Sequence, residues 1–112
     1  MKLIKQLLHR LRPTTVLEGP SIPPDMEPEF LALYERFREF SMTSIERMYA
    51  LYQATKYILD NNIGGDIVEC GVWRGGGMMM CAAMLAERPN HGRKIILYDT
   101  FSGMTEPGEK DI

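Results

Sequence analysis

A glycine-rich turn and a later carboxylate are the residues whose types and spacing are best suited to chemistry. The turn runs from Glu69 to Gly77, and Asp99 follows it after roughly 20 positions. Glycines let backbone N–H groups approach an anionic ligand at the start of a helix. An acidic residue at this distance along the chain binds the hydroxyls of a ribose. The two features together predict a ligand that contains a ribose.

The order of residues in the turn limits which nucleotide it can hold. A dinucleotide fingerprint, Gly-x-Gly-x-x-Gly, needs its second glycine to make room for a pyrophosphate. Counted from Gly71, that position is Trp73, and counted from Gly75, the third glycine is replaced by Met80. No Gly-Lys-Ser or Gly-Lys-Thr follows the glycines, which excludes a P-loop. S-adenosylmethionine, a cofactor with a ribose but no phosphate, fits better.

The two ends of that cofactor predict partners in and around the turn. We expect Glu69 to bind the ammonium of its amino-acid end, directly or through water, and Arg74 to bind the carboxylate with backbone N–H groups. Asp99 is expected at the ribose, and Phe101 and Ser102, directly after it, are placed to meet the adenosine. Each residue also has a plainer structural interpretation, as part of a tight connection, a solvated strand end or an ordinary loop.

Hydrophobic periodicity predicts the elements that position these residues. Helices are expected over 29–40 and from 41–46 to about 60, with Thr43 and Glu46 at capping-box spacing. Short β-prone runs at 66–70 and 94–98 flank a nearly all-apolar helix over 78–87. The order predicts an α/β fold, in which helices precede the N-terminal part of a doubly wound, Rossmann-like parallel sheet that stops after its second strand. We expect both faces of these strands to be covered.

The first 28 residues differ in composition from the rest. Apolar residues at helical spacing alternate with basic ones over 3–12, and prolines recur over 13–28. We therefore divide the chain into an amphipathic helix with a proline-rich linker, residues 1–28, and a partial cofactor-binding α/β domain, residues 29–112. The apolar stretch is far short of the roughly 20 residues that cross a bilayer, so we expect no stable membrane insertion. Its docking onto a second subunit would make a homo-oligomer.

Composition narrows the class of protein further. Thirteen basic and fifteen acidic residues give a net charge of −2, whereas binding a nucleic-acid backbone takes an excess of lysine and arginine. We expect no nucleic-acid partner. Two cysteines in apolar contexts suit a reducing, cytoplasmic location. Neither His9 nor His91 stands at metal-ligand spacing from another His, Cys or carboxylate pair. We assign no metal ligand and no catalytic residue.

The sequence resembles the macrocin O-methyltransferase (TylF) family in three stretches. They are Gly-Asp-Ile-Val-Glu-Cys-Gly-Val-Trp-Arg-Gly-Gly over 65–76, Tyr-Asp-Thr-Phe-Ser-Gly-Met over 98–104, and Met-Thr-Ser with a later Arg and Tyr-Ala-Leu-Tyr-Gln-Ala over 42–54. The resemblance implies a class I methyltransferase fold, S-adenosylmethionine as donor and a small-molecule hydroxyl acceptor, often on a deoxysugar of a natural product. It also implies Mg²⁺, held by aspartates further down the chain that have no counterpart here. Thr105 and Gly77 depart from the family's usual proline and serine or alanine.

Residues from the turn, the strand ends and the start of the second helix make up the candidate cofactor-binding set. Its members are Thr43, Glu69, Gly71, Trp73, Arg74, Gly75, Asp99, Phe101 and Ser102. We expect the chain to be the N-terminal, cofactor-binding part of an S-adenosylmethionine-dependent O-methyltransferase, inactive by itself. Two alternatives stay open: an NAD-type oxidoreductase domain and a non-catalytic interaction module.

Overall fold

The computed structural model describes residues 23–88 and 92–111. The elements follow in the order α2 (Pro28–Phe37), the 3₁₀ turn η1 (Arg38–Phe40), α3 (Ile45–Asp60), β1 (Ile67–Cys70), α4 (Gly76–Ala86), β2 (Ile95–Tyr98) and the 3₁₀ turn η2 (Glu109–Asp111). The predicted order, helices followed by a strand–helix–strand unit, is confirmed. The amphipathic helix predicted near the N-terminus and most of the proline-rich linker lie outside the described residues.

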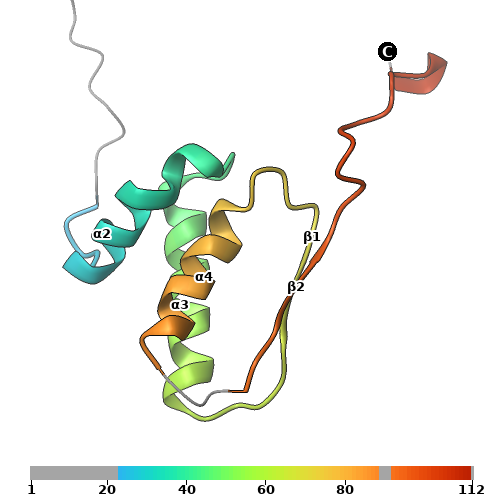
Figure 1. Cartoon of the computed structure of the whole chain (residues 1–112). Helices are drawn as coiled ribbons and strands as arrows, with labels where there is room; N and C mark the ends of the chain where they lie inside the picture. Colours follow the sequence, from blue (N-terminus) through green and yellow to red (C-terminus); the bar gives the residue numbers. More distant parts are fainter. Residues whose placement is uncertain (1–22, 89–91, 112) are drawn as a thin grey trace, which may run out of the picture.

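The two strands run parallel, joined by α4. Ile67 pairs with Ile95 at one end of the sheet, and Cys70 pairs with Tyr98 at the other. The described α-helices α2, α3 and α4 lie on one side of the strands (Figure 1). The expectation that both faces are covered is therefore wrong for the described residues. Side chains alternate between the faces of a strand, and Val68, which points away from the helices, is 52% exposed.

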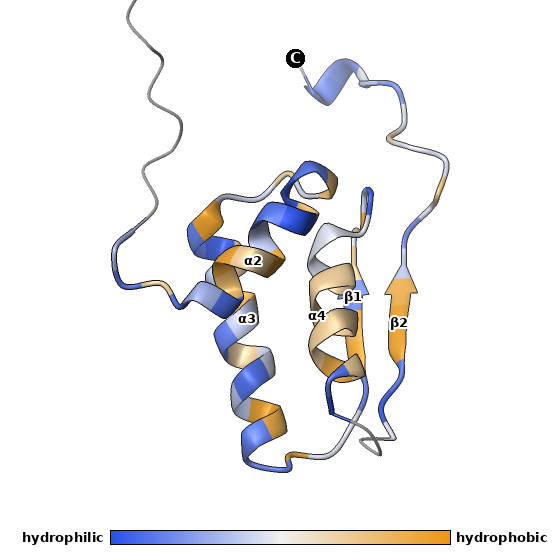
Figure 2. Ribbon diagram, turned by 60° about the vertical axis from the view of Figure 1, so that its left-hand side comes forward, coloured by the Kyte–Doolittle hydropathy of each residue, from blue (hydrophilic) through white to orange (hydrophobic). Residues whose placement is uncertain are grey.

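The hydrophobic core lies where the three helices meet. Phe30 from α2, Met48 from α3 and Met80 from α4 are fully buried. The ring of Phe30 packs edge-on against that of Tyr49, with 5.0 Å between their centroids. Helix α4 is apolar over most of its surface because it lies between the other helices and the strands (Figure 2). None of the described helices combines the length and the apolar character needed to cross a membrane.

The connection between α2 and α3 differs from the prediction. The helix expected over 29–40 starts at Pro28 and becomes a 3₁₀ turn after Phe37. The predicted capping box is wrong: Ser44 is the N-cap of α3 and its side chain makes no capping hydrogen bond. The Thr43 hydroxyl instead hydrogen-bonds to Oγ of Ser41 at 2.8 Å. The result is a compact loop over 41–44 beside the start of α4.

Candidate functional site

The glycine turn leaves β1 in a conformation that glycines alone do not explain. Gly71 and Gly75 have φ of +80° and +82°, and Trp73 between them has φ of +50°. This left-handed conformation costs a residue with a side chain about 1 to 2 kcal/mol. The N–H of Gly71 donates to the carbonyl of Tyr98 at 2.8 Å, and that of Gly75 to the carbonyl of Val72 at 2.9 Å. The turn therefore closes on itself while its first residue stays attached to β2.

Asp99, directly after β2, binds the backbone of this turn. Its Oδ2 accepts hydrogen bonds from the N–H of Val72 at 2.7 Å and of Trp73 at 3.3 Å. Its Oδ1 accepts from the N–H of Phe101 at 3.1 Å and from the Thr100 hydroxyl at 3.4 Å. These backbone donors, Val72 first, lower the pKa of Asp99 to about 2. The carboxylate is thus ionised at neutral pH.

A first cavity, of about 260 Å³, lies between the start of α3, the 41–44 loop and the start of α4. We call it the helix-side cavity. Glu69, on the helix-facing side of β1, lines it, and its Oε2 is buried without a hydrogen-bond partner among the described residues. Burial raises the pKa of this carboxyl above its usual value. A buried carboxylate oxygen without a partner is an acceptor available to a positively charged ligand.

Gly77 makes the close approach of Glu69 possible. A Cβ added to Gly77 would lie 3.4 Å from Oε1 of Glu69 and 3.0 Å from Cδ2 of Leu51. The neighbouring Gly76 serves packing: a Cβ there would lie 2.7 Å from the carbonyl carbon and oxygen of Phe40. These two glycines bring the helices and the 41–44 loop around the cavity.

Arg47 also lines the helix-side cavity, and the candidate set did not include it. Its guanidinium has no hydrogen bond or ion pair within the part of the chain that the structure describes, so it is available to an anion. Thr43, which was in the set, lines the same cavity, and so does Leu51. The signal was the spacing between Arg47 and Leu51, which are four positions apart in α3 and therefore lie on one face of that helix, and Thr43 lies in the loop just before it.

A second cavity, of about 710 Å³, lies at the carboxyl ends of the strands. We call it the strand-end cavity. Asp99 and Phe101, both predicted for the cofactor, line it together with Met104. Gly71 and Trp73 line both this cavity and the helix-side cavity. The structure therefore brings six of the candidate residues to two adjoining cavities: Thr43, Glu69, Gly71, Trp73, Asp99 and Phe101.

The remaining candidates lie elsewhere. The guanidinium of Arg74 stacks on the ring of Trp73, with 4.9 Å from Cζ to the ring centroid. Arg74 and Gly75 line a separate apolar groove of about 470 Å³ against α4 and β2. The exposed Ser102 lines none of these three spaces, and its N–H points to the Thr100 hydroxyl at 3.4 Å. The arginine that lines the helix-side cavity together with Glu69 is Arg47, not Arg74.

Sequence comparison relates the segment that contains both cavities to a known family. The sequence model of the macrocin-O-methyltransferase (TylF) family matches residues 36–112, which include both cavities. The chain belongs to this family.

Two curated relatives are similar over part of their length. The 8-demethyl-8-(2,3-dimethoxy-alpha-L-rhamnosyl)-tetracenomycin-C 4'-O-methyltransferase of Streptomyces olivaceus is 31% identical over 109 residues, which cover 96% of this chain and 41% of that protein. Demethyldecarbamoylnovobiocin O-methyltransferase of Streptomyces niveus is 33% identical over 69 residues, 62% of this chain and 26% of that protein. The chain thus spans less than half of either TylF-type relative. No solved structure gives a significant match.

Proposed function

We propose that this chain forms the S-adenosylmethionine-binding part of an O-methyltransferase that acts on a hydroxyl group of a sugar-bearing small molecule. Family membership supports methyl transfer to oxygen, and the rhamnosyl group named for one relative supports the acceptor class. The observation that carries the proposal is the buried, unpartnered Oε2 of Glu69 in a cavity that Arg47 also lines. An anion and a cation facing one small space suit the zwitterionic end of an amino acid.

The two cavities would divide the cofactor between them. In the helix-side cavity, Glu69 would accept hydrogen bonds from the ammonium and Arg47 would donate to the carboxylate, with Thr43 beside them. In the strand-end cavity, Phe101 offers an aromatic face for the adenine. Gly71 and Trp73 border both spaces, so one molecule with an amino-acid end and an adenosyl end would pass across them.

When bound, the cofactor would supply an electrophilic methyl group on a positively charged sulfur for transfer to the acceptor oxygen. This chain's own residues bind and orient, and positioning supplies much of the rate of such a reaction. We assign no general base here. The carboxylate oxygens of Asp99 already accept hydrogen bonds from backbone N–H groups, and Glu69 would bind the ammonium. Within 23–88 and 92–111, no three carboxylate, His or Cys side chains gather as metal ligands would. The Mg²⁺ that the resemblance implies is therefore given no residue of this chain.

Binding of S-adenosylhomocysteine to the 112-residue chain, measured by titration calorimetry, tests the proposal. We expect micromolar affinity, weakened about 10- to 100-fold by Glu69→Gln or Arg47→Met, since each removes a charge-assisted hydrogen bond. Arg36→Met is the matched control, because Arg36 stacks on Phe37 at 5.0 Å and lines neither cavity. It should leave the affinity unchanged.

The same titration separates the alternatives. Binding of NAD in place of S-adenosylhomocysteine would favour the oxidoreductase domain, although Trp73 occupies the place of the pyrophosphate glycine. A correctly folded chain that binds neither molecule would contradict the proposal and favour a non-catalytic interaction module.

A further inference from the structure

Asp99 has a second role in this fold that the ribose prediction did not include. Its two carboxylate oxygens accept from three backbone N–H groups and one hydroxyl, all within the chain. A carboxylate offers about four acceptor sites. Most of the hydrogen-bonding capacity of Asp99 is therefore used before any ligand arrives.

The donors at Oδ2 are two consecutive residues inside the glycine turn, between Gly71 and Gly75. The side chain of Val72 is buried beneath the turn, and the next residue, Trp73, has the left-handed φ of +50°. Bulky residues rarely adopt this conformation unless their surroundings hold them there. A carboxylate that accepts from the N–H groups of both residues is a strong restraint of this kind.

The position of Trp73 matters because it lines all three of the spaces described above. It borders the helix-side cavity, the strand-end cavity and the apolar groove beside α4, and its side chain stays half exposed among them. A change in the backbone at 72–73 would swing the indole ring and change the passage between the first two cavities.

We propose that Asp99 is the positioning residue that fixes the shape of the glycine turn and thereby holds Trp73 between the two cavities. The restraint acts in the free protein, through the N–H groups of Val72 and Trp73. Its consequence for cofactor binding rests on the function proposed above, but the restraint itself does not.

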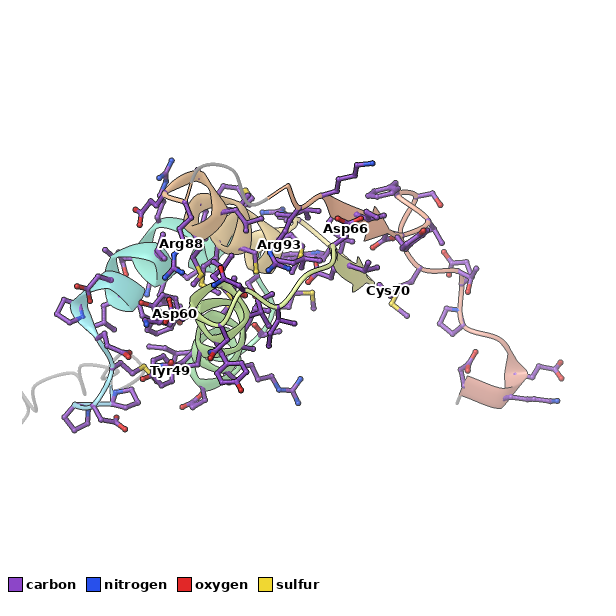
Figure 3. The ribbon with its side chains drawn as sticks, turned by 90° about the horizontal axis from the view of Figure 1, so that it is seen from below. Tyr49, Asp60, Asp66, Cys70, Arg88 and Arg93 are labelled. Carbon is purple, nitrogen blue, oxygen red and sulfur yellow. The ribbon has the colours of Figure 1, made fainter. Side chains whose placement is uncertain are left out.

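The only tryptophan of the chain gives a direct probe of this restraint. In Asp99→Asn, which keeps the size of the side chain, we expect a changed emission maximum of Trp73 and easier quenching by acrylamide without any ligand. The control is Asp66→Asn. Asp66 also joins the strands, accepting from the N–H of Lys94 at 2.9 Å, but it precedes β1, whereas Cys70 ends that strand at the turn (Figure 3). This control should leave Trp73 emission unchanged.

Amide hydrogen exchange in the wild-type chain gives a second measurement that does not depend on any variant folding. The N–H of Val72, bonded to Asp99, should exchange at least about tenfold more slowly than that of Arg74, which has no acceptor among the described residues. In Asp99→Asn the protection of Val72 should fall by a similar factor.

Each outcome decides the proposal. Equal exchange of Val72 and Arg74 in the wild type would overturn it. Unchanged Trp73 emission in a folded Asp99→Asn chain would also overturn it, and weaker S-adenosylhomocysteine binding in that same variant would then make Asp99 a direct ribose ligand only. Because both measurements use the ligand-free chain, a failure to bind S-adenosylhomocysteine would contradict the proposed function and leave this inference standing.

Discussion

Glu69→Gln should make the free chain more stable at neutral pH while weakening its binding of S-adenosylhomocysteine. The physical reason is that Oε2 of Glu69 is buried with no partner among the described residues, and burial raises the pKa of the carboxyl. A carboxylate kept without a partner is costly to the folded state and available to a ligand. Glutamine has nearly the same shape and still places a polar atom there, but it carries no charge, so it removes the added cost of burying a charge together with the attraction for a cation.

The size of the effect follows from the cost of a buried polar group without a partner, about 1 to 3 kcal/mol. Glu69 is only partly buried, so we take the low end, a gain of about 1 kcal/mol, which corresponds to a rise in Tm of about 4 to 8 °C. A raised pKa means that the folded state holds the proton more tightly than the unfolded state does. The cost is therefore absent below the unfolded value of about 4.3. It grows as the pH rises through the folded pKa.

Urea denaturation of both chains between pH 4 and 8 measures this gain. Glu27→Gln is the matched control, because Glu27 is another part-buried glutamate whose Oε2 has no partner within the described part of the chain, but its Oε1 accepts a hydrogen bond from Gln53. Hydrogen bonds from Tyr49 and Gln53 lower the pKa of Glu27. This control should therefore be less stable than the wild type above pH 5, opposite in sign to Glu69→Gln. If Glu69→Gln loses stability at pH 7 as Glu27→Gln does, the carboxylate has an internal partner and the reasoning is wrong.

Two further predictions concern the surroundings of the site. Gly76→Ala places a Cβ 2.7 Å from the carbonyl of Phe40, which should lower the free energy of unfolding by about 1 to 3 kcal/mol. Thermal denaturation should show this loss. The control Gly64→Ala, whose added Cβ has nothing within 4 Å, should show no loss. Asp99, with its pKa lowered to about 2, adds stability that is complete above the unfolded value of about 3.9 and is lost as the pH falls toward 2. Acid denaturation of Asp99→Asn should lack this component, and an unchanged acid profile would contradict the assignment.

The sequence predicted the elements well because their signals are local. The periodicity of α3 and the glycines around β1 depend on neighbouring residues, and the predicted strands differ from the observed ones by one residue at the first position. The pairing of the turn with Asp99 was also predictable, since parallel strands bring their carboxyl ends to one edge of a sheet. The hydrogen bonds that Asp99 accepts from Val72 and Trp73 were not predictable, because they depend on the backbone conformation of the turn.

The residues whose positions were not predicted from the sequence are those whose positions depend on packing between distant segments. Arg74 is next to Trp73 in the chain, and stacking on that ring carries it away from Glu69. Arg47 is more than 20 positions from Glu69 in the sequence, and only the packing of α3 against α4 brings both to one cavity. Periodicity predicts that α3 has a buried face, but it does not predict which element covers the first turn of the helix.

The four glycines of the turn have two different structural roles, which explains why the segment departs from a dinucleotide fingerprint. Gly71 and Gly75 supply the left-handed corners of the turn, whereas Gly76 and Gly77 leave room for Phe40 and Glu69. Counted from Gly71, Trp73 stands in place of the second glycine, and counted from Gly75, Met80 stands in place of the third. This turn gives the helix-side cavity closely packed walls, which include the buried carboxylate of Glu69. Those walls suit a ligand that is recognised by a positive charge rather than by phosphate.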